Sequence, residues 1–247
     1  MRERSLGLGA MGFHAYLQRH SIPFESAMAK GRNLQMFGRI KGEAVRATRQ
    51  LAEERGECPD GEGYGVRNAH LLAIAPNASS SIICGNTSPS IEPYRANAFT
   101  QKTKSGSSLL KNEYLEDTLQ DLGYDTDDVW KSILTNGGSV QHLDFLDQWT
   151  KDVFKTAVEI DQRWVIEMAG DRQEFICQSQ SLNVFFPANI SKQELHAVHM
   201  MAWKRGVKTL YYLRSEAMKR AENVSDEVLR QYIFDSIDDE GCLACEG

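Results

Sequence analysis

The 247-residue sequence has no block of basic residues and no apolar run long enough to cross a membrane. Lys and Arg number 28 against 34 Asp and Glu, and the resulting net charge of −6 predicts no nucleic-acid-binding surface. No repeat of fixed period and no low-complexity tract is present. With 41% hydrophobic and 25% charged residues, the composition is that of an ordinary globular protein with a sizeable core.

Cysteine is scarce, and its odd count argues against a secreted disulfide scaffold. The first residues are too polar and mixed for a convincing signal peptide, so we expect a cytosolic protein with reduced thiols. The histidines do not form a metal-ligand pattern, and no metal site is expected in this chain. The five cysteines are Cys58, Cys84, Cys177, Cys242 and Cys245.

Strands separated by helices predict an α/β fold. Helical spacing predicts a long helix through residues 34–51 that stops at Gly56, and further helices follow later in the chain. The later helices are expected over 125–138, 149–168, 191–206 and 225–237. Apolar runs predict strands at 67–76, 179–187 and 207–213, with a polar loop over 76–93. Three strands are few, so we expect an incomplete sheet.

Tyr211 and Tyr212 stand side by side in the third predicted strand. Aromatic residues favour strands, so both could simply be packed core residues. Neighbours in an ideal strand point to opposite faces, and the two rings can touch only if the strand is distorted or ends there. Two phenols in contact could pass an oxidising equivalent, because each can lose an electron and a proton in turn.

The stretch Pro76, Asn77, Ala78, Ser79 and Ser80 follows the first predicted strand. Ligands of α/β sheets gather beyond the carboxyl ends of strands, and these hydroxyl and backbone N–H groups suit an anionic phosphate. The stretch lacks the Gly-Lys-Ser/Thr of an ordinary P-loop. A merely hydrophilic turn is the alternative interpretation.

Cys242 and Cys245 are separated by two residues in an acidic tail. Such a pair can close to a disulfide and so deliver two electrons, and a mobile chain end could carry it between two sites. Half of a zinc site is a second interpretation, although tetrahedral zinc needs four ligands. A spacing without function is the third, because an isolated C-x-x-C is a weak signal.

Several stretches together resemble the C-terminal portion of the large, catalytic subunit of class I ribonucleotide reductase. They are "RSLGLGAMGFHAYL", "RNAHLLAIAPNASSSIICGNTSPSIEP", "GSVQHLDFL", "RQEFICQSQSLNVFF" and "KRGVKTLYY", followed by a tail with paired cysteines. They stand in the family's order and run along nearly the whole chain. The resemblance implies the C-terminal half of a ten-stranded α/β barrel over residues 1–236, helix-rich, with a flexible redox-active tail over 237–247.

The resemblance also implies roles for the residues singled out above. Tyr211 and Tyr212 correspond to a pair that relays a radical from a small, metal-containing subunit towards a catalytic cysteine. Cys242 and Cys245 correspond to tail thiols that reduce an active-site disulfide and are themselves reduced by thioredoxin or glutaredoxin. The stretch Pro76–Ser80 corresponds to the substrate-phosphate loop. The implied activity is reduction of ribonucleotides to deoxyribonucleotides in the cytoplasm, or in the host cytoplasm for a viral protein.

Several features of the family are missing from the sequence. The Asn-x-Cys-x-Glu motif, the two cysteines of the active-site disulfide and the nucleotide-binding cone are absent, and Ala78 stands where some relatives carry Glu. We therefore expect a partner chain that carries the missing thiols; a split gene, as in some large bacteriophages, and a truncated chain would look the same. The metal-radical cofactor is expected in the small subunit and not here. The alternatives are a non-catalytic interaction module and a separate thiol-redox protein.

Overall fold

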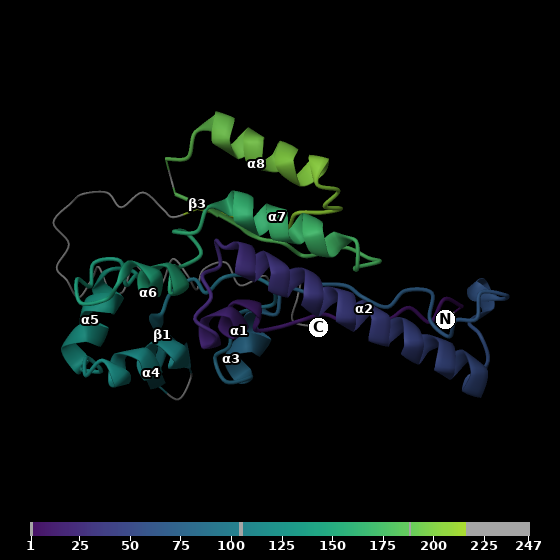
Figure 1. The fold of residues 1–247 in the computed structure, drawn as a ribbon, viewed down its shortest axis with the longest axis horizontal. Coiled ribbons are helices and arrows are strands. Elements are labelled where there is room, and N and C mark those ends of the chain that lie inside the picture. Colours follow the sequence, from purple (N-terminus) through teal and green to yellow (C-terminus); the bar gives the residue numbers. More distant parts are fainter. Residues whose placement is uncertain (1, 104–105, 188, 216–247) are drawn as a thin grey trace.

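The computed structural model describes residues 2–103, 106–187 and 189–215. Figure 1 shows a long helix, α2, with α7 beside it and α8 beyond α7, while the shorter helices gather at one end of α2. The helices are α1 (Phe13–Arg19), α2 (Ala27–Arg55), α3 (Ala78–Ile83), α4 (Glu113–Asp121), α5 (Asp127–Thr135), α6 (Gln148–Val153), α7 (Gln162–Gln173) and α8 (Lys192–Lys204). The strands are β1 (Ala98–Thr103), β2 (Gly106–Lys111), β3 (Val184–Phe186) and β4 (Leu213–Ser215).

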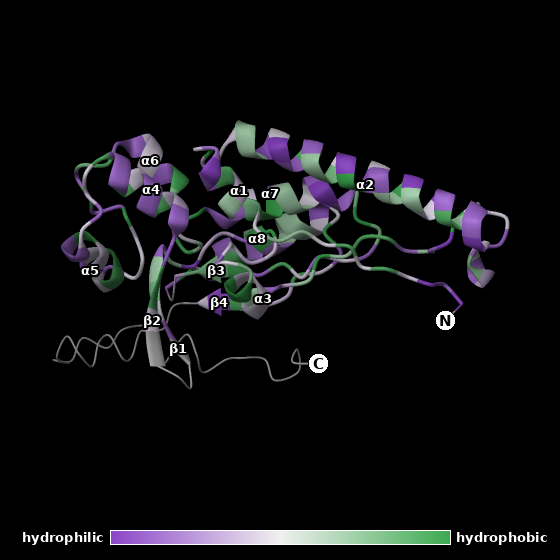
Figure 2. Cartoon of the chain, turned by 90° about the horizontal axis from the view of Figure 1, so that it is seen from below, coloured by the Kyte–Doolittle hydropathy of each residue, from purple (hydrophilic) through white to green (hydrophobic). Residues whose placement is uncertain are grey.

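The long helix α2 ends at the predicted Gly56 and begins seven residues before the first residue on which it was predicted, Leu34. The Ser26 hydroxyl accepts a hydrogen bond from the Ala29 N–H group at 3.1 Å, which satisfies one of the free donors of the first turn. Gly56 ends the helix with a φ of 77°, a conformation that glycine adopts without strain. The predicted helix is confirmed and is longer than the span on which it was predicted. Polar and apolar residues alternate along it (Figure 2).

The helices predicted over 125–138 and 191–206 are also confirmed, as α5 and α8. Each begins with a side-chain cap, in which the hydroxyls of Thr126 and Ser191 accept from the N–H groups of Val129 and Glu194. Gly206, just past α8, has a φ of 72° and so allows the chain to turn away.

Four extended segments run parallel to one another and form the framework of the site. Two of the three pairings between neighbouring segments are isolated bridges, and among these four segments only β3 and β4 are regular strands. The pairs are Leu8–Leu72, Ile74–Gln180 and Val184–Leu213. The three predicted strand segments thus lie next to one another. The regular strand β3 is shorter than predicted, β4 shares only Leu213 with the predicted strand at 207–213, and 67–76 forms isolated bridges alone. The first segment, around Leu8, had no strand prediction.

The single helix predicted over 149–168 is wrong, because the chain forms two helices there. Between α6 and α7 the Ala157 N–H group donates to the Tyr94 carbonyl, a bond that leaves the helical pattern. The Asp161 carboxylate then starts α7 by accepting from the Arg163 N–H group at 2.9 Å. The apolar stripe on which the prediction rested is nevertheless largely buried, since Val153, Ala157 and Ile160 face the interior and Trp164 is half-buried.

Several further elements differ from the predicted pattern. The loop predicted over 76–93 contains the short helix α3, and α1, α4 and the antiparallel hairpin of β1 and β2 were not predicted. The hairpin carries a mixed polar sequence and α1 is short, so neither has a strong periodic signal. The helix α4 does carry one, because Leu115 and Leu119 are buried one turn apart after the Asn112 cap, and it was missed. The helix predicted over 225–237 and the domain boundary at 236/237 lie outside the described residues.

Two apolar cores hold the described residues together. The larger core lies between α2, α7 and the parallel segments, and the smaller one lies beneath α4, α5 and α6. Fully buried members of the larger core include Phe24, Phe37, Leu72 and Ile166. Trp130 and Ile133 are central to the smaller one. Among the described helices none is long and apolar enough to cross a membrane.

Candidate functional site

Tyr211 and Tyr212 lie directly before β4, and their rings are in contact. The ring centroids are 4.1 Å apart with an interplanar angle of 51°. The Tyr211 hydroxyl donates to the Tyr212 hydroxyl over 3.4 Å, a long hydrogen bond. Tyr211 is 39% exposed and Tyr212 is half-buried, so the pair can be reached from the surface of the described residues. The two adjacent phenols therefore form the contact that an ideal strand would forbid.

A one-residue offset in the backbone ladder explains the contact. The Val184 N–H group donates to the Tyr212 carbonyl at 3.0 Å, and in a regular parallel ladder the Tyr212 N–H group would bond to the Leu182 carbonyl. Instead the Tyr211 N–H group takes that carbonyl, at 2.8 Å. The chain carries one extra residue at this point, as in a β-bulge, and such a bulge changes the direction of a side chain.

The side chain of Asn183 compensates for the missing ladder bond. Its Oδ1 atom accepts from the displaced Tyr212 N–H group at 3.0 Å. The backbone N–H and the Nδ2 atom of Asn183 donate in turn to Oε1 and Oε2 of Glu92, at 3.1 and 3.2 Å. Burial raises the pKa of Glu92, which is only 1% exposed, and the two bonds from Asn183 oppose that rise.

The Arg214 guanidinium lies over the ring of Tyr212, with its carbon 4.5 Å from the ring centroid. This is a cation–π distance, and the contact packs one face of the phenol. Arg95 lies similarly over Phe185, at 5.7 Å. The tyrosine pair is therefore held by the cationic side chain of Arg214 as well as by its backbone.

The predicted phosphate stretch begins where the second parallel segment ends. Ile74 pairs with Gln180, and three residues further along the same segment Asn183 lies level with Tyr212. The chain therefore enters α3 at the same end of the four parallel segments, the parallel array, as the tyrosine pair. Asn77 begins α3 with a φ of 51°, and the first backbone bond into the helix runs from Ser81 to the Asn77 carbonyl. The preceding N–H groups have no partner within the helix. Ala78, Ser79 and Ser80 are exposed.

The described cysteines occupy three different environments, and none forms a disulfide. Cys58 is buried, Cys84 is exposed and Cys177 is half-buried. Burial tends to raise the pKa of Cys177, but the N–H groups of Leu71 and Leu72, together with Lys41, lower it overall. The two N–H groups lie 3.2 and 3.3 Å from its sulfur. Cys242 and Cys245 lie outside the described residues.

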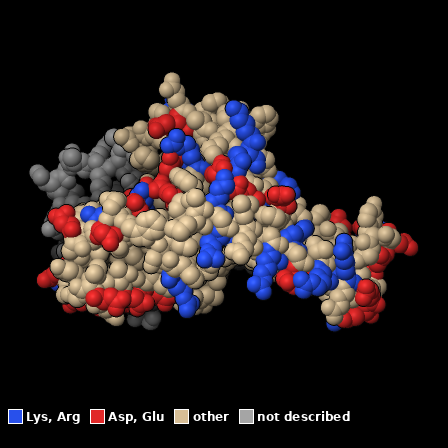
Figure 3. Space-filling model, in the orientation of Figure 1, with Lys and Arg blue, Asp and Glu red and all other residues tan. Residues whose placement is uncertain are grey.

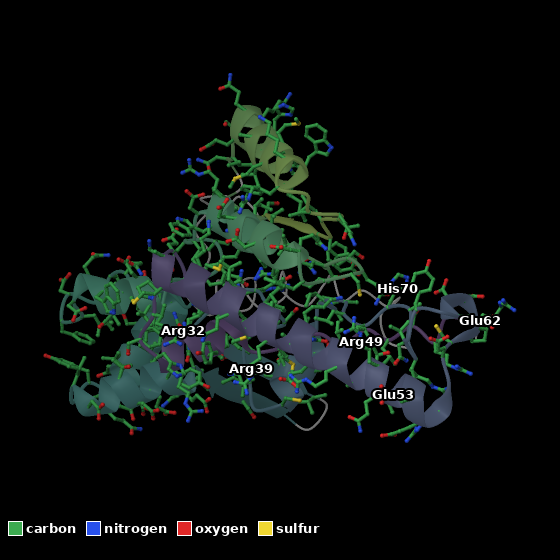
Figure 4. The ribbon with its side chains drawn as sticks, turned by 45° about the vertical axis from the view of Figure 1, so that its right-hand side comes forward. Arg32, Arg39, Arg49, Glu53, Glu62 and His70 are labelled. Atoms are coloured by element: carbon green, nitrogen blue, oxygen red, sulfur yellow. The ribbon has the colours of Figure 1, made fainter. Side chains whose placement is uncertain are left out.

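The described histidines and acidic side chains form no group that could hold a metal ion. His196 and His199 are exposed on α8, while His14 is fully buried in α1. Basic side chains on α2 are spread along its exposed face, as Figure 3 shows, and Figure 4 places Arg32, Arg39 and Arg49 along its length. Acidic residues join them only in the second half of the helix, at Glu43, Glu53 and Glu54, and the exposed side chains form a solvated helix face.

His14 makes a testable contribution to the pH dependence of stability. Burial lowers its pKa to about 3, against about 6.5 in the unfolded chain, so the unfolded state binds the extra proton between these values. The free energy of unfolding should therefore fall as the pH drops below 6.5. Between pH 6.5 and 4.5 the loss is about 2–3 kcal/mol.

The matched variant is His14→Asn, because its Oδ1 atom can still accept from the Tyr94 N–H group as Nδ1 of His14 does at 3.0 Å. Urea unfolding of both proteins between pH 7 and 4.5 should show a shallower pH dependence for the variant. Parallel pH profiles would show that His14 is not the titrating group.

Asn183 and Glu92 have no counterpart among the predicted site residues. Each is a single polar residue inside an apolar or loop segment, and only the backbone bonds reveal that they meet at the tyrosine pair. The sequence "SIEP" places a carboxylate within an otherwise uncharged stretch, and this is a signal that could have drawn attention to Glu92.

The chain matches the family model for the ribonucleotide reductase barrel domain over residues 1–62 and 59–213. It is 50% identical over 228 residues to the ribonucleoside-diphosphate reductase large subunit of Invertebrate iridescent virus 6, covering 91% of this chain and 24% of that protein. The large subunit of Invertebrate iridescent virus 3 is 43% identical over 99% of this chain and 39% of its own length. The solved class Id ribonucleotide reductase alpha subunit of Actinobacillus ureae superimposes with a TM-score of 0.81 at 41% identity, over 87% of this chain and 40% of that one.

The fold and the comparisons thus define an α/β protein with a barrel domain. The chain belongs to the ribonucleotide reductase family and corresponds to a C-terminal part of its large subunit. It spans less than half the length of these relatives.

Proposed function

We propose that the chain works as the C-terminal portion of a ribonucleoside-diphosphate reductase large subunit and reduces ribonucleotides only when it is assembled with the portion it lacks. The observation that carries the proposal is the contact between the Tyr211 and Tyr212 hydroxyls, 3.4 Å apart. A pair of packed core aromatics does not need this contact, whereas a radical relay does. Family membership supplies the reaction class.

In the proposed relay, one phenol loses an electron and a proton to the oxidising equivalent that arrives from the small subunit. Its phenoxyl oxygen then takes a hydrogen atom from the other phenol, so that the unpaired electron moves by one residue and the first phenol is restored. The second phenoxyl takes a hydrogen atom from the thiol of the catalytic cysteine, which lies on the missing portion. The exposed edge of Tyr211 and the half-buried Tyr212 fit a path that runs inwards.

The loop Pro76–Ser80 is proposed to bind the substrate phosphates. Its exposed Ser79 and Ser80 and the first N–H groups of α3 supply donors, at the same end of the parallel array as the tyrosine pair. Ser81 does not take part, because it is buried and its hydroxyl donates to the Ala78 carbonyl. With Ala78 in place of an acidic residue, backbone and hydroxyl groups have to provide the whole site.

Cys242 and Cys245 are proposed to reduce the active-site disulfide and to be reduced by thioredoxin or glutaredoxin. One tail thiolate attacks the disulfide, the second thiol closes the tail disulfide, and two electrons and two protons pass to the active-site cysteines. The proposed partners are thus a large-subunit portion with the catalytic cysteines, a small subunit with the metal-radical cofactor, and a small thiol reductant, in the cytoplasm of the cell or of a viral host.

Reconstitution tests the proposal against its alternatives. The chain, the complementary large-subunit portion and the small subunit should together form deoxynucleotide from ribonucleotide, and omission of this chain should abolish the product. A non-catalytic interaction module predicts that the product forms at the same rate without it. A separate thiol-redox protein predicts disulfide reductase activity of the chain alone.

Assembly itself gives a further prediction. Within the described residues no further strand pairs with the outer segment around Leu8, and Leu6 and Leu8 are each 52% exposed. Unpaired strand edges and exposed apolar side chains favour association. We expect the chain to co-elute with the complementary portion as a stable complex in gel filtration.

A charged residue on this edge should weaken that complex. Leu8→Glu is expected to reduce the affinity for the complementary portion at least tenfold, because a buried unpaired charge opposes association. Leu122→Glu is the matched control, since Leu122 is 49% exposed and lies after α4, outside the parallel array. A chain that elutes as a monomer in the presence of the complementary portion would contradict the incomplete-barrel interpretation.

A further inference from the structure

We propose that Asn183, held in place by Glu92, is a positioning residue for the Tyr211–Tyr212 pair. The Asn183 side chain stabilises the one-residue offset before β4 that brings the two phenols into contact. The effect on turnover rests on the proposed radical relay, whereas the effect on the phenol contact does not.

The offset leaves one backbone donor without its ordinary acceptor. Tyr211 occupies the Leu182 carbonyl, so the Tyr212 N–H group depends on Oδ1 of Asn183, at 3.0 Å. Asn183 is 3% exposed, and a buried N–H group without an acceptor is costly. Without the Asn183 amide the regular ladder is favoured, because Tyr212 could then bond to the Leu182 carbonyl. Removal of the offset would return the two side chains to opposite faces.

Glu92 fixes which end of the Asn183 amide faces Tyr212. Its Oε2 atom accepts from Nδ2 and its Oε1 atom accepts from the backbone N–H group of the same residue. Oδ1 is therefore the only amide atom left for the Tyr212 N–H group. An amide in the opposite orientation would place its NH₂ group against that N–H group, and two donors would face each other.

A second buried side-chain amide accepts a backbone N–H group of β3, and this bond does not involve the tyrosines. Gln162, which is 4% exposed, accepts the Phe185 N–H group with its Oε1 atom at 2.9 Å. This bond supports the Phe185 N–H group in β3 and not the Tyr212 N–H group. Gln162→Ala is therefore the matched control for a general loss of stability.

An exchange of the two functional groups gives a sharp test. Glu92→Gln alone sets an NH₂ group against one of the two donors of Asn183, and Asn183→Asp alone sets two carboxyl groups against each other. In the double variant Glu92→Gln, Asn183→Asp, the new amide at position 92 donates to the new carboxylate at position 183. The second oxygen of that carboxylate again accepts from the Tyr212 N–H group. Shape and net charge are unchanged and only the donor and acceptor are exchanged, so the double variant should recover what each single variant loses.

The measurements use the full chain in the assembled complex, with thermal unfolding recorded for every variant. Asn183→Ala and both single exchange variants should lose at least tenfold in kcat with KM for the ribonucleotide unchanged. Hydrogen exchange of the Tyr211 amide should be at least tenfold faster, because Tyr211 loses the Leu182 carbonyl to Tyr212 when the offset is removed. Crystal structures should show the two hydroxyls separated. The double exchange variant should return within about threefold of the parent in each measurement. Gln162→Ala should change thermal unfolding alone.

Two results would overturn the positioning role. One is an intact phenol contact in Asn183→Ala, and the other is a folded double variant as impaired as the single variants. If Asn183→Ala does not fold, the comparison of the single and double exchange variants still tests the positioning role. Separated phenols with unchanged turnover would support the positioning role and contradict the radical relay, so the two proposals fail in different ways.

Discussion

Tyr211→Phe and Tyr212→Phe are each expected to abolish deoxynucleotide formation in the assembled complex while leaving the fold intact. Phenylalanine keeps the ring and most of the packing, including the contact of residue 212 with Arg214 at 4.5 Å. It lacks the hydroxyl hydrogen that the relay has to pass on. The free energy of unfolding should change by about 1 kcal/mol or less, as is usual for such a conservative exchange.

The control for this pair is Tyr124→Phe. Tyr124 is 43% exposed and stacks on Phe145 with 3.9 Å between ring centroids, away from the parallel array. Loss of its hydroxyl should leave turnover unchanged. If either variant of the tyrosine pair kept near-normal turnover, that residue would not be on the radical path. A loss of activity in proportion to a loss of stability would indicate core aromatics instead.

Cys242→Ser and Cys245→Ser are expected to abolish repeated turnover with thioredoxin as the reductant. Serine cannot form or exchange a disulfide, so either change breaks the proposed relay of two electrons. A single round of product formation should survive, because the thiols that reduce the substrate are expected on the complementary portion. The measurement is product per active site, with and without the thioredoxin system.

Cys84→Ser is the matched control for the tail variants, because Cys84 is an exposed thiol outside the tail. It should support repeated turnover at the parent rate. Equal loss of the single round and of repeated turnover in the tail variants would point to a structural role of Cys242 and Cys245.

The parts of the fold that follow from the sequence are those with a strong local signal. The long helix α2 has a side-chain cap at Ser26 and a stop at Gly56, and both ends lie where local chemistry places them. The stripe of Val153, Ala157 and Ile160 correctly predicted burial and wrongly predicted one helix. Periodicity reports which residues face the core, but it cannot report a backbone bond to Tyr94 that interrupts the helix.

For the candidate site, the sequence identifies the phenols but not their support. The adjacency of Tyr211 and Tyr212 is visible in the chain, and so is the condition that a strand must be distorted for them to touch. The distortion itself depends on Asn183 and Glu92, which are 91 residues apart, and on a bond between a side chain and a displaced backbone N–H group. Such long-range polar contacts leave no periodic pattern in a single sequence.

The most direct test of the central proposal is to observe the unpaired electron on the pair itself. Tyr212 can be replaced by 3-aminotyrosine, which is oxidised more easily than tyrosine and so retains the electron that passes through it. When this variant is mixed with the complementary portion, the small subunit and the substrate, electron paramagnetic resonance should show an aminotyrosyl radical that forms as the small-subunit radical disappears. A small-subunit radical that persists, or that disappears without any aminotyrosyl signal, would contradict the proposed relay.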